Sequence, residues 1–163
     1  MIRRFVVSAA VFLVISHATP AFADATAFIG VHTNPDRQVM KGFAVGFGLL
    51  IIGFEGEYAS AGEDNSAGLP SLTMVNGNVL LQTPVPIFGT QFYFTTGIGG
   101  YHEELDALAH SETNMVYNTG GGAKISLLGP LRLRLDYRLL KLQGETIRPS
   151  AVHRIYAGIN LAF

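Results

Sequence analysis

The chain has 163 residues, no cysteine, and 12 acidic against 11 basic side chains, which gives a formal net charge of −1. These values fit one domain, and they exclude a disulfide framework and the strongly basic face of a nucleic-acid-binding protein. Mean hydropathy is positive at +0.32, yet no run of about eighteen apolar residues follows residue 23 to predict a membrane-spanning helix. A β-barrel is then the fold by which such a chain could face lipid.

The first 23 residues predict a secretory signal peptide. Arg3 and Arg4 give a short positive region, Phe5–Ile15 is apolar except for one serine, and Ala21–Ala23 reads as an A-x-A cleavage site. The apolar run is too short to span a bilayer as a helix, although a retained membrane anchor is the alternative. The mature chain is expected to begin at Asp24, which makes residues 24–163 the barrel domain.

Eight segments after the signal peptide alternate between large apolar residues and polar or small ones. This period of two predicts strands with two different faces, each about long enough to cross an outer membrane when tilted. The segments are 26–33, 39–49, 52–59, 72–82, 91–101, 116–127, 131–142 and 150–163. The sixth is the least regular because of Gly120, Gly121 and Gly122.

Segment 39–49 shows the clearest contrast in side-chain size. Phe43, Val45 and Phe47 alternate with Gly42, Ala44 and Gly46. A small eight-stranded barrel has an interior just wide enough for side chains, so small residues must make room for large ones. The large row is therefore predicted to face lipid and the small row to face a crowded lumen.

The last two segments carry the same pattern with charges. Leu131, Leu133 and Leu135 alternate with Arg132 and Arg134. In the final segment an apolar row from Ile155 alternates with a polar or small row from Arg154 and ends on Phe163. Such a C-terminal strand predicts an interaction with the barrel-assembly machinery.

The connections fit an even number of strands with both chain ends on the periplasmic side. Predicted outer links are 34–38, 60–71, 102–115 and 143–152, and predicted inner links are 50–51, 83–90 and 128–130. The third outer link is acidic and is expected to be solvated; its acids are Glu103, Glu104, Asp106 and Glu112. The fold class predicted is all-β, an eight-stranded antiparallel up-and-down transmembrane β-barrel.

One polar constellation stands out, a set of charges that strand parity directs into the lumen. Its members are Glu55, Glu57, Lys124, Arg132, Arg134, Asp136, Arg138 and Arg154. Unpaired ions in a narrow lumen are costly, whereas opposite charges two residues apart or on neighbouring strands offset one another. We interpret the set as a network that fills and rigidifies the barrel. A conduction path, and a ligand or partner at the lumen mouth, are the alternatives.

Other candidates concern lipid contact and chemistry. Lys41 and Lys141 have outward parity near the outer rim, where they could contact lipopolysaccharide phosphates or simply snorkel. His102 lacks the second histidine of a metalloprotease helix. His153 is read as an interfacial residue rather than as part of a lipid-modifying site with Ser150 and Glu145. No catalytic, metal or cofactor site is expected.

Several short motifs resemble those of the small eight-stranded outer-membrane barrels of the OmpX and OmpA type, over essentially the whole mature chain. The motifs are Ala21–Ala23, Gly53–Tyr58, Thr96–Gly100, Leu135–Arg138 and Ala157–Phe163. The resemblance implies the fold and the outer membrane of a Gram-negative bacterium as the compartment. Activity is less well specified, because such proteins include structural components, adhesion surfaces, narrow channels and a few lipid-modifying enzymes.

The function predicted is that of a non-enzymatic integral outer-membrane protein that presents extracellular loops and contributes to the envelope. A narrow porin-like channel for ions or small solutes is the first alternative, and a lipid-A-modifying enzyme is the second. A soluble lipocalin-like barrel would need its apolar row inside, and the charged rows opposite the leucines argue against it.

Overall fold

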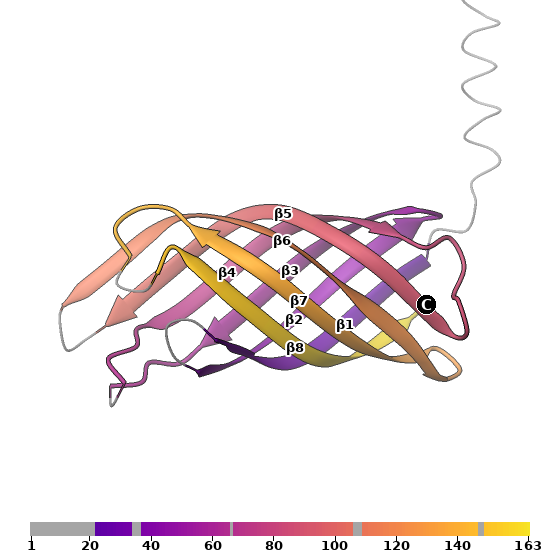
Figure 1. Cartoon of the computed structure of the whole chain (residues 1–163), viewed down its shortest axis with the longest axis horizontal. Helices are drawn as coiled ribbons and strands as arrows, with labels where there is room; N and C mark the ends of the chain where they lie inside the picture. The colour runs from indigo at the N-terminus through magenta and orange to yellow at the C-terminus, as the bar shows by residue number, and fades with distance from the viewer. Residues whose placement is uncertain (1–21, 34–36, 66, 106–108, 147–148) are drawn as a thin grey trace, which may run out of the picture.

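The computed structural model describes residues 22–33, 37–65, 67–105, 109–146 and 149–163, which form a closed antiparallel barrel (Figure 1). The predicted signal peptide up to residue 21, and Asp106, lie outside the described residues. Each strand pairs with its neighbours in the chain, and the last closes on the first. The strands are β1 (Phe22–His32), β2 (Gln38–Leu49), β3 (Ile52–Ala61), β4 (Ser71–Gln82), β5 (Thr90–Leu105), β6 (His110–Leu128), β7 (Leu131–Leu142) and β8 (Ala151–Ala162).

The predicted fold class is confirmed, and each of the eight predicted segments corresponds to one strand. The closing pair of β1 and β8 runs from Asp24 opposite Ala162 to His32 opposite Arg154. Beyond it, in the chain before the expected cleavage after Ala23, the amide of Ala23 donates to the carbonyl of Phe163 at 3.0 Å, and the reverse bond is 2.9 Å. Closure gives each of the eight described strands a hydrogen-bonded neighbour on both sides, which is the condition for a sheet in lipid.

Both chain ends of the barrel lie at one end, here called the inner end, and the opposite end is called the outer end (Figure 1). Two inner connections are tight turns, with positive φ at Leu50 and Gly129. The third, between β4 and β5, is longer and ends in a turn with positive φ at Phe88 and Gly89. No helix among the described residues is long and apolar enough to cross a bilayer.

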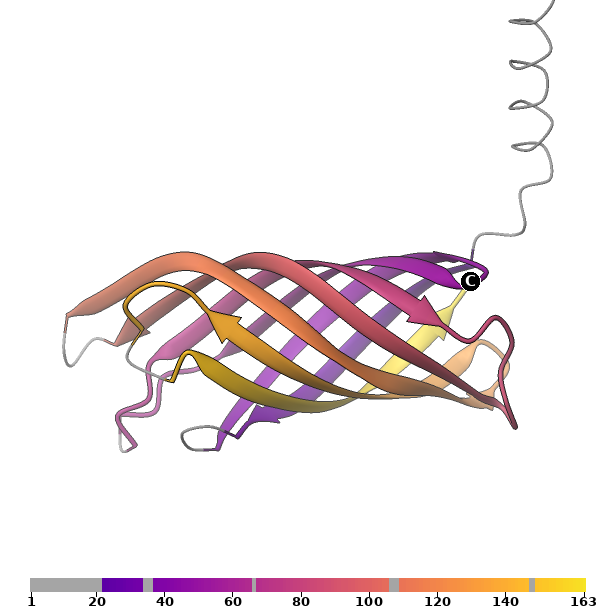
Figure 2. The same cartoon turned by 45° about the horizontal axis from the view of Figure 1, so that its top comes forward.

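The hairpin of β5 and β6 corrects the prediction of a long acidic loop at 102–115. Glu103 and Glu104 lie in β5 and Glu112 lies in β6, so only a short link joins the strands. The alternation of facing directions continues through these polar residues, because the part of a strand beyond the apolar belt can carry charge on either face. Figure 2 shows that this hairpin projects past its neighbours at the outer end.

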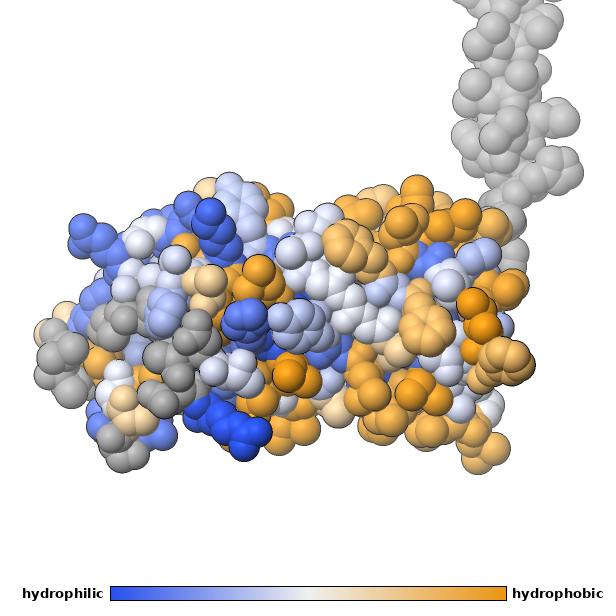
Figure 3. All heavy atoms as spheres, in the orientation of Figure 1, coloured by the Kyte–Doolittle hydropathy of each residue, from blue (hydrophilic) through white to orange (hydrophobic). Residues whose placement is uncertain are grey.

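On the face shown in Figure 3, the half of the barrel nearest the chain ends is mainly apolar, and polar side chains gather toward the other end. The outward rows include Phe43, Phe47, Phe94, Leu135 and Ile155, whose exposed fractions lie between 44% and 55%. So large an apolar belt is stable against lipid and not against water. The lipocalin-like alternative is therefore wrong, because the apolar rows face out and the charged rows face in.

Candidate functional site

Six of the predicted charged residues meet in the middle of the lumen and are here called the central network. Strand alternation aims them inward from β3, β7 and β8, and each is at most 5% exposed. The six residues are Glu55, Glu57, Arg134, Asp136, Arg138 and Arg154. Three guanidinium groups and three carboxylates therefore share one water-excluded space.

Glu55 on β3 reaches across the barrel to two arginines of β7. Arg134 donates from both terminal nitrogens to the two oxygens of this carboxylate, the second bond being 3.3 Å. Arg138 Nη2 donates to Glu55 Oε1 at 3.0 Å. Bidentate guanidinium–carboxylate pairs are the strongest neutralising contact available to buried ions.

Asp136 lies between the same two arginines on β7. Arg138 Nε donates to its Oδ1 at 3.0 Å, and Arg134 Nη2 donates to its Oδ2 at 3.3 Å. The hydroxyl of Tyr93 on β5 donates to Asp136 Oδ2 at 2.5 Å and accepts from Arg134 Nε at 2.8 Å. Asp136 thus has partners on both sides along β7 and a third partner on β5.

Glu57 completes the network on the outer side of Glu55. It forms ion pairs with Arg138 at 3.2 Å and with Arg154 on β8 at 2.8 Å. The guanidinium of Arg154 also lies 5.4 Å from the ring centroid of Tyr156. The three positive and three negative charges balance, and this balance offsets much of the cost of burying them.

The glycines of β6 explain how these long side chains fit. Gly120 is opposite Arg138 and Gly122 is opposite Asp136. A Cβ on Gly120 would lie 2.8 Å from Arg138 Cα, and one on Gly122 would lie 2.5 Å from the Tyr93 hydroxyl oxygen. The irregular sixth segment is therefore the wall against which the network packs.

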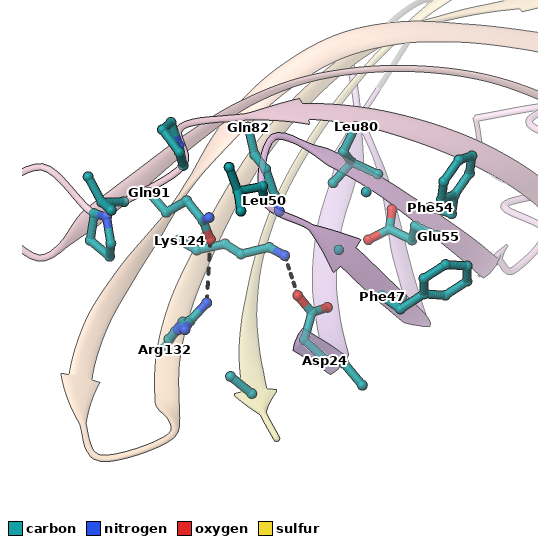
Figure 4. Close-up of a pocket in the computed structure, with 18 residues that line it drawn as sticks. Asp24, Phe47, Leu50, Phe54, Glu55, Leu80, Gln82, Gln91, Lys124 and Arg132 are labelled. Carbon is teal, nitrogen blue, oxygen red and sulfur yellow. Dashed lines mark hydrogen bonds and ion pairs between the residues drawn. The ribbon is translucent and has the colours of Figure 1, made fainter. Parts of the chain in front are cut away.

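The other two predicted members lie apart, nearer the inner end. Lys124 forms an ion pair with Asp24 of β1, and Arg132 Nη1 donates to Gln91 Oε1 at 3.4 Å (Figure 4). Asp24 is not among the lumen charges predicted from the sequence, because no facing direction was assigned to the expected first residue of the mature chain. The eight predicted residues thus form two groups rather than one network.

An apolar layer, which was not predicted from the sequence, lies on the outer side of the network. Its large side chains have the same inward parity as the charged rows, and they are at most 2% exposed. They are Met40, Leu72, Met74, Tyr101, Val116, Leu140, Leu142 and Val152. The lumen is therefore filled twice, first by paired ions and then by apolar side chains.

Glu103 corrects the expectation of a solvated acidic segment. Its side chain is buried at the outer end of the lumen. It accepts a 2.8 Å hydrogen bond from Thr146 Oγ1 and lies 3.4 Å from His110 Nε2. Glu104 and His102, one position to either side, face outward and are exposed. Within the described ranges, no group of three or more His, Asp or Glu side chains could hold a metal ion.

The residues considered for lipid contact lie on the exterior. Lys41 on β2 and Lys141 on β7 are exposed near the outer ends of their strands, with β8 and β1 between them. His153 faces outward and its Nδ1 lies 2.7 Å from the hydroxyl of Tyr137. The described contacts do not join His153 to Ser150 or Glu145.

These features define a class by fold: the chain has the architecture of the small eight-stranded outer-membrane barrels. It is similar to the N-terminal β-barrel domain of Pseudomonas aeruginosa OprF, with a TM-score of 0.69 and 12% identity over 87% of this chain and 97% of that one. It is also similar to Neisserial surface protein A, with a TM-score of 0.67 and 11% identity over 88% and 97% of the two chains.

Two further structures share the fold at a TM-score of 0.54. One is Ail, the attachment invasion locus protein of Yersinia pestis, with 13% identity over 88% of this chain and 98% of that one. The other is the outer-membrane enzyme PagL, with 9% identity over 85% and 98%. No protein-family model matches the chain, and no curated protein sequence does. At these identities the likeness establishes the fold alone.

Proposed function

We propose that this chain is a non-enzymatic integral outer-membrane protein of a Gram-negative bacterium, with a sealed lumen and surface-exposed outer strand ends. The observation that carries the proposal is the double filling of the lumen. Arg134, Arg138 and Arg154 are 0% exposed and paired with carboxylates, and the apolar layer follows directly. Ions would have to displace both layers to pass.

Several features support the membrane setting. The outward apolar rows match a hydrocarbon environment, and the barrel architecture is that of outer-membrane proteins. The signal peptide expected over residues 1–23 would direct export. The closing strand β8, which Phe163 directly follows, would be the part of the chain that the barrel-assembly machinery recognises.

Lipid contact at the outer rim is part of the proposal. Lys41 and Lys141 extend from the exterior at the level where the apolar belt gives way to polar residues. An ammonium group there can pair with a phosphate while its methylene stem lies along apolar surface. We therefore assign both lysines to contact with lipopolysaccharide or other outer-leaflet phosphates.

Conductance in planar bilayers tests the sealed lumen. Protein purified from membranes, with folding verified by heat-modifiable gel migration, is expected to give no stepwise currents. Regular steps whose ion selectivity moves toward anions in Asp136→Asn would instead support the channel alternative, since that change removes one negative charge from the lumen.

PagL shows that the same fold can hold an enzyme. Ester hydrolysis of lipid A by the purified protein, lost on His153→Ala, would support that alternative.

A further inference from the structure

A cavity of about 340 Å³ opens at the inner end of the lumen, below the central network (Figure 4). It exists because the inward positions of β2 and β3 at this level are glycines, namely Gly46, Gly48 and Gly53. Without side chains there, nothing from this wall fills the space. The volume falls within the range of sites that bind small molecules.

One side of the inner cavity carries an unbalanced positive charge. Lys124 is neutralised by Asp24, and Glu55 at the upper limit of the cavity is engaged by Arg134. Arg132 is half-buried and is held only by the neutral amide of Gln91 at 3.4 Å. Among the described residues, no carboxylate lies within ion-pair distance of Arg132. A guanidinium fixed in this way is suited to accept a planar anion.

The opposite side of the inner cavity is largely apolar, with the amide of Gln82 as a polar group within it. Leu50 lines it from the turn between β2 and β3, and Leu80 lines it from β4. Pro84, Val85 and Pro86 line it from the long connection between β4 and β5. That connection is the one inner link that is longer than a hairpin needs. A site with one cation and an apolar wall matches a molecule with one anionic end and an apolar body.

We propose that the inner cavity binds a small amphiphilic carboxylate from the periplasmic side. The carboxylate accepts hydrogen bonds from Arg132, and the apolar body lies against Leu50, Leu80 and the proline-containing connection. The site meets the central network at Glu55, which Arg134 already engages, and it needs neither conduction nor catalysis by the barrel. Its existence does not depend on whether the lumen is sealed.

Fluorescence quenching provides the test, because the chain contains no tryptophan. Val85→Trp places a single emitter in the cavity wall. The probe is 6-bromohexanoate, whose bromine quenches indole on contact, and 6-bromohexanol is its neutral counterpart. We expect saturable quenching by the carboxylate at millimolar concentration and binding at least about tenfold weaker for the alcohol, since a charge-assisted hydrogen bond is lost.

Variants in the Val85→Trp background separate the proposed site from unspecific partitioning. Arg132→Gln should weaken carboxylate binding about tenfold or more, whereas Arg37→Gln, at an exposed position just before β2 at the outer end, should leave it unchanged. Gly53→Leu should abolish it by filling the cavity, since a Cβ there meets its nearest atoms at 3.5 Å and can be accommodated. Gly56→Leu is the matched control, because no atom lies within 4 Å of its Cβ position on the outward face.

Heat-modifiable migration of every variant establishes that each one is folded before binding is measured. Quenching that is equal for acid and alcohol, or that Arg132→Gln leaves unchanged, would overturn the carboxylate assignment. Quenching that survives Gly53→Leu would place the probe in the lipid or micelle rather than in the cavity. The absence of saturable quenching in the folded Val85→Trp protein would also overturn the proposal.

Discussion

The central network and the apolar layer fill the same lumen by opposite means. The network packs three arginines against three carboxylates, and the layer outside it packs leucine, methionine and valine. The ionic layer depends on every partner being present, because one missing charge leaves another buried and unpaired. The apolar layer has no such requirement, so it should tolerate exchange of similar volumes and suffer mainly from cavities.

Removal of the Asp136 charge should give the largest effect. In Asp136→Asn, Arg134 and Arg138 each lose a carboxylate partner within the lumen. We expect a loss of about 3–5 kcal/mol in the free energy of unfolding, measured by urea titration in detergent or lipid. Glu104→Gln, on the exposed face of β5, is the control and should change stability by less than about 1 kcal/mol. Equal effects of the two changes would contradict the network.

Truncation of a side chain in the apolar layer should give the second-largest loss in the free energy of unfolding. Leu140→Ala removes a side chain that is 0% exposed inside the lumen, and about 2–5 kcal/mol should be lost to the cavity. Leu139→Ala, the next residue on β7, removes a lipid-facing side chain that is 36% exposed. Its cost should be clearly smaller, because lipid chains can fill the space. A larger cost for Leu139→Ala would reverse the assigned facing directions.

A charge on the exterior tests the lipid-facing side of β7, after the ionic network and the apolar layer that the same strand presents to the lumen. Leu135→Arg places a guanidinium on the apolar belt, at an expected cost of roughly 2–4 kcal/mol near the middle of the membrane. Refolding yield into bilayers, read by gel migration, provides the measurement. Folding of this variant as efficiently as the parent would show that β7 does not face lipid on that side.

The smallest of these effects should come from substituting the glycines of β6, against which the central network packs. In Gly120→Ala the new Cβ would lie 2.0 Å from the carbonyl oxygen of Tyr137, so backbone must move, at a cost of about 1–3 kcal/mol. Gly77→Ala on the exterior of β4 meets its nearest atom at 3.9 Å and should be neutral or slightly stabilising. The urea midpoints of the two variants test whether β6 is glycine-rich for packing reasons.

Local alternation in the sequence was enough to predict the strands and their facing directions, since a period of two needs no knowledge of partners. It could not predict which charges meet across the lumen. Lys124 on β6 and Asp24 on β1 are not on adjacent strands, and their contact exists only because the barrel closes. The alternation along β7 gives the inward direction of Leu140 and Leu142. The apolar layer was still not predicted, because the inward row that these two residues continue is otherwise charged. Glu103 was assigned to a loop because acidic residues are typical of loops, whereas its alternation with His102 and Glu104 indicated a strand.

The seam between β1 and β8 also constrains the order in which the protein can form. It joins the first described strand to the last, and it is reinforced inside the lumen where Asn160 Nδ2 donates to Thr26 Oγ1 at 2.9 Å. Each hairpin can form from local sequence, but the seam has to wait until the whole chain is present, and the entropy of closing so long a loop favours the open sheet. Until then the two outermost strands carry unpaired backbone groups, so insertion and closure should occur as one cooperative event.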